Sequence, residues 1–274
     1  MGQTRSKDVI VTTRLVAAVA SLTVVVCIIA GQGATAWAQD RVPILVELFT
    51  SEGCSSCPPA DAFLQKLDEQ PIAGAEFVVL SEHVDYWNHD GWRDPYSSSD
   101  LTDRQRNYAT RFHLETVYTP QMVLDGGRQF SGSNIDEAQK AIEEALHRPK
   151  IALRISNVTL AQNRLRARVE SSPLVSSCGV RTVDVYVAVA LNRAESQVLR
   201  GENANRHLAH TAVVRKLFKV GKIKSGEQFT REIDLKVDGA FDPRNLRLVA
   251  FLQDPDSGKS VGAVTKTPDL DSQH

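Results

Sequence analysis

The sequence has no excess of charge of either sign. Its 32 Lys and Arg residues stand against 33 Asp and Glu residues, which leaves a formal net charge of −1. No basic cluster is interleaved with aromatic residues, so nucleic acid is excluded as an expected partner. The chain also lacks a Gly/Ser-rich linker, a block of like charge and an internal repeat. An apolar content of 42% in 274 residues is enough for an ordered core of one large or two small domains.

The N-terminus has the layout of a secretory signal peptide. Arg5, Lys7 and Arg14 form a positive leader, residues 15–30 are apolar and uncharged, and the small-residue segment 36–38 (AWA) follows. This pattern predicts a signal peptide over residues 1–38 and cleavage after Ala38. A retained single-span anchor is the alternative, but the apolar run is short for a bilayer. We therefore expect a periplasmic or secreted protein with no stable membrane insertion after cleavage.

Cysteine is scarce, with four residues in the whole chain. Cys27 would leave with the signal peptide, and Cys54 and Cys57 can pair as a disulfide in an oxidising compartment. Cys178 is then unpaired. A buried apolar role is favoured for it over a reactive thiol or half of an intermolecular bridge.

The cysteine pair lies between a predicted strand and a predicted helix. Residues 44–50 (ILVELFT) are typical of a buried strand, and apolar residues recur at helical spacing from Pro59 onward. Residues 77–80 (FVVL) predict a second buried strand. A CxxC pair in the order strand, CxxC, helix, strand indicates a redox motif.

The chain between this unit and Pro149 combines a loop, helices and a hairpin. Residues 81–98 are polar and rich in aromatic side chains, and a helix is expected from about residue 101 with Thr102 and Gln105 as a capping box. Strands are predicted at 122–124 and 128–130 around the Asp-Gly-Gly turn. Ser133 or Asn134 is expected to cap a last helix.

After residue 150 helical spacing gives way to alternation. Seven strands are expected, at 151–155, 165–170, 183–191, 211–220, 229–237, 246–252 and 261–265. The predicted fold class is an α/β thioredoxin-like domain over residues 39–149 followed by an all-β sandwich-like domain over residues 150–274.

The predicted chemistry is thiol–disulfide exchange. A helix N-terminus stabilises a thiolate, so Cys54 is the expected nucleophile and Cys57 the resolving thiol. Pro120, which follows Thr119 ahead of a strand, is expected beside the sulfurs. Glu47 is either a buried carboxylate that accepts the proton of Cys57 or a side chain that points to solvent, and the pattern favours neither.

Several segments resemble a secreted bacterial family, the domain of unknown function 1223 family. They are LVELFTSEGCSSCPPAD, HVDYWNHDGWRDPYSS, RQRNYA, VYTPQMVLDG and GENANRHLAHTAVVR. The resemblance covers nearly all of the chain after the signal peptide. It implies a thioredoxin-like domain followed by a β domain, and no assigned substrate. Gly53 stands where thioredoxin has tryptophan, and Pro58-Pro59 also depart from thioredoxin, so partner specificity does not carry over.

Other functions remain open beside an oxidoreductase that acts on protein thiols or disulfides. The pair could be a structural disulfide in a binding protein, although a CxxC bond closes a very short loop. Cys54 and Cys57 could bind zinc or Cu(I) together with His83 or His89, although the histidines lack a fixed ligand spacing. No cofactor and no bound metal are expected. The polar segment from Gly201 to His210 (GENANRHLAH) is expected to form a hydrogen-bonded corner between the two domains.

Overall fold

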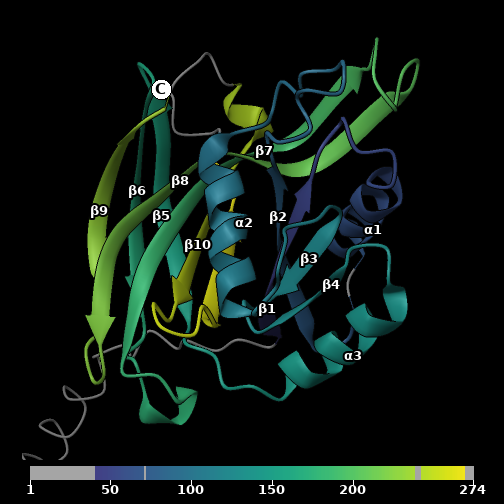
Figure 1. Ribbon diagram of the computed structural model, residues 1–274. Helices are drawn as coiled ribbons and strands as arrows, with labels where there is room; N and C mark the ends of the chain where they lie inside the picture. The colour runs from purple at the N-terminus through teal and green to yellow at the C-terminus, as the bar shows by residue number, and fades with distance from the viewer. Residues whose placement is uncertain (1–40, 71, 238–241, 269–274) are drawn as a thin grey trace, which may run out of the picture. The chain divides into compact units, whose positions relative to one another are not determined.

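Strands dominate the computed structural model, which describes residues 41–70, 72–237 and 242–268 (Figure 1). The strands are β1 (Val42–Thr50), β2 (Ala75–His83), β3 (Gln121–Leu124), β4 (Arg128–Ser131), β5 (Leu153–Ala161), β6 (Arg164–Ser171), β7 (Thr182–Gln197), β8 (His207–Lys224), β9 (Thr230–Lys236), β10 (Leu246–Gln253) and β11 (Ser260–Lys266). The helices are α1 (Pro58–Glu69), α2 (Ser99–Arg111) and α3 (Ile135–Leu146), with short 3-10 turns at Ser176–Cys178 and Pro243–Asn245. The expected signal peptide lies outside the described residues. Within them, no helix is both long and apolar enough to cross a membrane.

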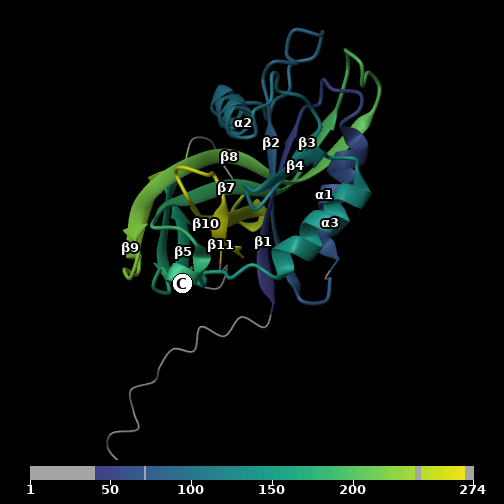
Figure 2. The same ribbon diagram turned by 60° about the horizontal axis from the view of Figure 1, so that its bottom comes forward.

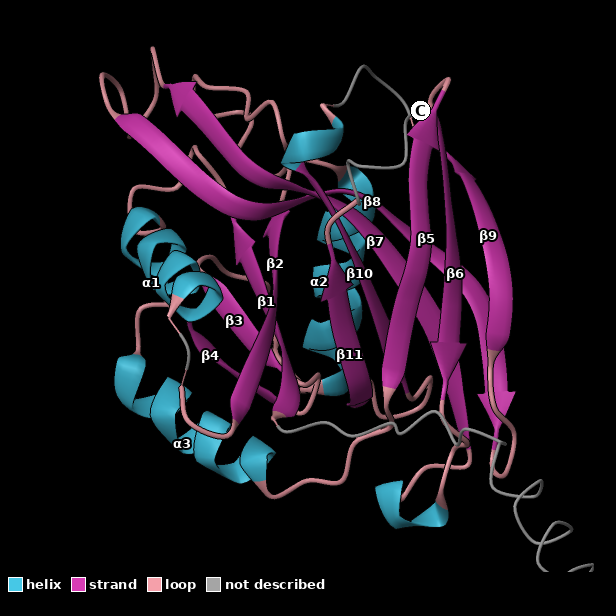
Figure 3. Ribbon diagram, turned by 180° about the vertical axis from the view of Figure 1, so that it is seen from behind, coloured by secondary structure: helices cyan, strands magenta, loops and turns pink. Residues whose placement is uncertain are grey.

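Eight of these strands form one mixed sheet, in the order β11-β10-β7-β8-β2-β1-β3-β4. β1 and β2 are parallel, and β3 is antiparallel to β1. The long strands β7 and β8 form an antiparallel hairpin, and β8 joins β2 at a parallel pair between Ser81 and Val213. The other three strands form a separate sheet in the order β5-β6-β9, which Figure 3 shows beside β7 and β10.

This sheet corrects the predicted fold class. The prediction of an α/β thioredoxin-like domain followed by an all-β sandwich-like domain is wrong. Four of the strands after residue 150, β7, β8, β10 and β11, belong to the same sheet as the four strands before it. The protein is mostly β, with three helices in the described residues. Alternation located the strands, but it carries no information about which strands pair.

Different elements pack against the two faces of the large sheet. On β1, Ile44, Val46 and Leu48 pack under α1 and α3, whereas Leu45 packs toward α2. On β7, the residues at odd positions from Val183 to Val189 face the three-stranded sheet. One face therefore carries α2, and the other carries α1 and α3 at one end and the small sheet at the other (Figure 2).

Candidate functional site

Cys54 and Cys57 form a disulfide at the start of α1, as the sequence predicted. Their Cα atoms are 5.5 Å apart, a separation that a disulfide bridges without backbone movement. Cys57 is the N-cap of α1, and its carbonyl accepts hydrogen bonds from the N–H groups of Ala60 (2.9 Å) and Asp61 (3.1 Å). The two prolines that follow Cys57 occupy the first turn, where a helix has no partner for an N–H group.

Both cysteines are wholly buried, at 0% exposure each. The paired cysteines therefore do not differ in accessibility. Ser55 and Ser56 between them are exposed. The hydroxyl of Ser56 lies 3.3 Å from the Sγ atom of Cys54, so it can donate a hydrogen bond to that sulfur.

The loop that joins β7 to β8 is hydrogen-bonded to the segment that carries the disulfide. The side-chain amide of Asn203 donates to the carbonyls of Glu52 and Cys54, at 2.9 Å each. The Glu202 carboxylate accepts a hydrogen bond from the N–H of Ser55 at 3.0 Å. The polar segment that the sequence placed at a domain corner is thus a direct neighbour of the disulfide.

A buried cluster of charge connects both sides of the disulfide to β8. We call Glu52, Asp61 and His210 the His210 cluster. The Nε2 atom of His210 is 3.4 Å from a Glu52 carboxylate oxygen, and its Nδ1 atom is 3.6 Å from an Asp61 oxygen. Burial lowers the pKa of His210, but the Asp61 and Glu52 carboxylates outweigh burial and raise the pKa to about 10. His210 is therefore an imidazolium at neutral pH.

A second buried pair, formed by His83 and Asp94, lies against this cluster. The Nδ1 atom of His83 is 2.7 Å from the Asp94 carboxylate, and the rings of His83 and His210 meet edge to face at 4.6 Å. Burial raises the pKa of Asp94, but His83 and two backbone N–H groups outweigh it and lower the pKa to about 2. Trp92 donates its indole N–H to Glu52 at 2.7 Å, so the aromatic loop after β2 also holds the site.

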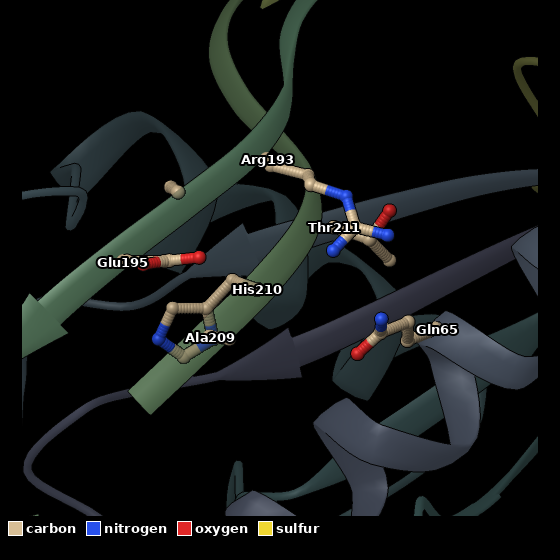
Figure 4. A pocket seen from close by; sticks show the side chains of 7 residues that line it. Gln65, Arg193, Glu195, Ala209, His210 and Thr211 are labelled. Carbon is tan, nitrogen blue, oxygen red and sulfur yellow. The ribbon is translucent and has the colours of Figure 1, made fainter. Parts of the chain in front are cut away.

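A small pocket of about 10 Å³ reaches His210 from the outside. Figure 4 shows His210 and Glu195 on neighbouring strands, with Gln65 facing them from α1. Arg193 and Thr211 also line it. This volume is on the order of that of one water molecule.

The predicted site residues Pro120 and Glu47 lie in different surroundings. The Thr119–Pro120 peptide bond is cis. A Cβ atom placed on Gly132 would lie 2.9 Å from Cβ of Ala60 and 3.2 Å from Cβ of Pro120, so Pro120 adjoins the first turn of α1.

Glu47 is buried on the other face of β1, under α2. Its carboxylate accepts hydrogen bonds from Nε of Arg104 and from the hydroxyl of Tyr108, at 2.6 Å each. No described contact joins Glu47 to Cys57. Its role as proton acceptor for Cys57 stays a prediction, and these contacts do not support that role.

The described residues contain no group of three or more His, Cys, Asp and Glu side chains that could hold a metal ion. His83 is engaged by Asp94, and His89 is exposed. The structure therefore does not bring the two cysteines and the two histidines together as metal ligands.

Sequence reasoning missed most of the buried polar residues around the disulfide. Glu52 and Asp61 flank it in the chain, but each has the appearance of a solvent-exposed residue beside a turn. The only signal for Asp61 was its spacing of four residues from Cys57, which places two side chains on one face of a helix. Nothing local links either residue to His210, which is far along the chain.

Comparison with known proteins gives a family but no activity. The family described as "Protein of unknown function (DUF1223)" matches residues 45–253. The crystal structure of protein AGR_C_4864 from Agrobacterium tumefaciens is similar, with 26% identity, a TM-score of 0.63 and coverage of 86% of this chain and 99% of that chain. HBP35 of Porphyromonas gingivalis has 14% identity and a TM-score of 0.60, and the match covers 85% of this chain and 77% of that chain. The latter likeness concerns the fold alone. No curated protein matches the sequence.

Proposed function

Because the chain belongs to the DUF1223 family, which is described only as having unknown function, we propose its function from the site itself. The protein exchanges thiols and disulfides with partner proteins through Cys54 and Cys57. The observation that carries this proposal is the disulfide at the N-terminus of α1, with a serine hydroxyl beside the sulfur of Cys54. No cofactor is needed for this reaction.

The chemistry balances with the two cysteines alone. The Cys54 thiolate attacks a partner disulfide, forms a mixed disulfide and releases one partner thiolate. Cys57 then attacks the Cys54 sulfur, re-forms the Cys54–Cys57 disulfide and releases the second partner thiolate. The partner gains the two electrons that the protein loses. The positive end of the α1 dipole and the Ser56 hydroxyl favour the thiolate at Cys54.

Burial of the sulfurs makes access part of the proposed function. Both cysteines are covered when oxidised, so exchange requires local opening around Ser55 and Ser56. Pro120 adjoins the first turn of α1 and has no N–H group, so we assign it to the wall along which a partner chain would pass. We also propose that the protein works after export, in the periplasm or outside the cell. The signal-peptide pattern motivates this, together with the persistence of disulfides in oxidising compartments.

The test compares two cysteine variants in cells. Cys57→Ser leaves a nucleophile without a resolving thiol, so disulfide-linked complexes with partner proteins should accumulate. Cys54→Ser removes the nucleophile and should trap little. Non-reducing gels followed by identification of the trapped proteins measure both. Equal trapping by the two variants would contradict the assigned roles.

The complete burial of both cysteines favours a second candidate, a structural disulfide in a binding protein. In that case neither variant traps a partner, and the wild-type pair stays oxidised in the presence of reductant. The same gels therefore separate the two functions.

A further inference from the structure

The proposed exchange requires a proton to leave a buried thiol. Cys57 attacks as a thiolate, so its thiol proton must pass to a base before or during the second step. In the disulfide form Cys57 is wholly buried, so we expect its sulfur to have little direct contact with bulk water even after local opening at Ser55 and Ser56. A buried base near Cys57 with an outlet to solvent would solve this problem.

Asp61 has the position of such a base. Asp61 lies on α1, four residues after the N-cap Cys57, and its N–H donates to the Cys57 carbonyl at 3.1 Å. Side chains at this helical spacing have Cβ atoms about 5–6 Å apart. Thr50 donates a hydrogen bond to Oδ2 of Asp61 at 3.2 Å, which fixes the carboxylate. The Oδ1 atom is buried and has no hydrogen-bond partner among the described residues, so it has a free lone pair.

His210 connects Asp61 to the outside. Its Nδ1 atom is 3.6 Å from Oδ1 of Asp61, and its ring also lines the pocket of about 10 Å³ in Figure 4. The titratable and charged groups around His210 come from five parts of the fold. They are Glu52 from the loop after β1, Asp61 from α1, His83 from β2, Asp94 and Tyr96 from the loop after β2, and Arg193 and Glu195 from β7. Most of them are acidic, which favours passage of a positive charge.

We propose that Asp61 accepts the proton of Cys57 and that His210 passes it to the pocket between Arg193 and Glu195, which deepens the proposed function and rests on it. The Cys57 proton moves to Asp61 as the Cys57 sulfur attacks Cys54. Neutral Asp61 no longer supports the imidazolium, so the pKa of His210 falls from its raised value and the ring releases its proton to water in the pocket. Asp61 then returns its proton to the neutral ring. One proton leaves in total, and the cluster regains its starting charges.

Stopped-flow mixing of the reduced protein with an excess of the chromogenic disulfide dithiobis(nitrobenzoic acid) separates the two steps. Attack by Cys54 releases a first coloured thiolate, and resolution by Cys57 releases a second. At neutral pH, Asp61→Asn should leave the first phase unchanged and slow the second by about tenfold or more, as expected for loss of a general base. His210→Gln should slow the second phase as well. Asp103→Asn, an exposed Asp-to-Asn change on α2, is the matched control and should alter neither phase.

Two further readouts separate a proton acceptor from a structural role. Asp61→Glu keeps a carboxylate and should restore most of the second-phase rate. In Asp61→Asn the second phase should become steeper with pH, approaching about a tenfold rise per unit, because thiolate formation then depends on the solvent. An unchanged first phase shows that each variant retains an intact site.

A normal first phase with a second phase unchanged in Asp61→Asn would overturn the proton route and leave the proposed function standing. A second phase that is slowed by Glu47→Gln but not by Asp61→Asn would also overturn the proton route, since Glu47 would then be the base. A wild-type protein whose disulfide resists reduction, and which therefore shows no first phase, would contradict the proposed function and this inference together.

Discussion

Replacing Arg104 by methionine should lower the free energy of unfolding by about 3–5 kcal/mol, the usual cost of removing one partner of a buried ion pair. Arg104 on α2 is bound to the carboxylate of Glu47 and lies 3.4 Å from that of Glu82, and both carboxylates are wholly buried. Burial raises the pKa of Glu82 well above its usual range, and the charge of Glu47 raises it further, while Arg104 opposes both. Arg104 is the cation beside these two buried carboxylates, and it compensates the charge of Glu47.

Methionine keeps an apolar stem but leaves that charge without a cation. The guanidinium also lies over the rings of Tyr108 and Phe251, at 5.2 Å from each centroid, and this contact is lost as well. Urea unfolding with the disulfide intact measures the effect. Arg106→Met on the exposed side of α2 is the matched control, and its surface pair with Asp103 should contribute less than about 1 kcal/mol. A loss for Arg104→Met as small as for the control would show that Glu47 is not held as a charged group.

His210→Gln should also cost about 3–5 kcal/mol at neutral pH, because it leaves two buried carboxylates without their shared cation. The effect should depend on pH in a defined direction. The pKa of His210 is raised from 6.5 in its unperturbed state to about 10 in the folded protein. The stabilisation that protonated His210 provides is thus fully present at pH values below its unfolded-state pKa. It is lost as the pH rises through its folded-state pKa.

The difference in unfolding free energy between wild type and His210→Gln should therefore be large at neutral pH and shrink as pH approaches the folded pKa of about 10. The measurement is a series of denaturant unfolding curves across this range. His207→Gln is the control, since His207 is 59% exposed and pairs with an exposed carboxylate. A difference that stays constant with pH would mean that His210 is neutral in the folded protein.

The sequence predicted most of the local structure because its signals are local. The β1 strand, the helix after the cysteine pair and the cap of α3 at Asn134 are confirmed. The cap of α2 was predicted wrongly as the Thr102 and Gln105 box. Ser98 is the N-cap, and the Thr102 hydroxyl donates instead to Asp85 at 2.6 Å. The contact between Thr102 and Asp85 outweighed the capping pattern. Sequence spacing cannot show such a contact.

The sheet and the candidate site depend on contacts between distant residues. Ser81 and Val213 join β2 to β8, and that pairing merges the strands that sequence analysis assigned to two domains. The same pairing brings His210 and Asn203 to the dithiol. Cys178, expected to be buried, is half-buried, and burial raises the pKa of its thiol. Short-range patterns identified the cysteine pair, but they could not identify what surrounds it.

The central claim is that the Cys54–Cys57 pair changes redox state in use. The direct test is thiol trapping of the purified protein, lacking residues 1–38, after equilibration in glutathione buffers of graded potential. We expect the pair to reduce and re-form reversibly, with a midpoint between about −270 and −120 mV, the range of dithiol oxidoreductases. A pair that remains oxidised below about −300 mV, as structural disulfides do, would contradict the account.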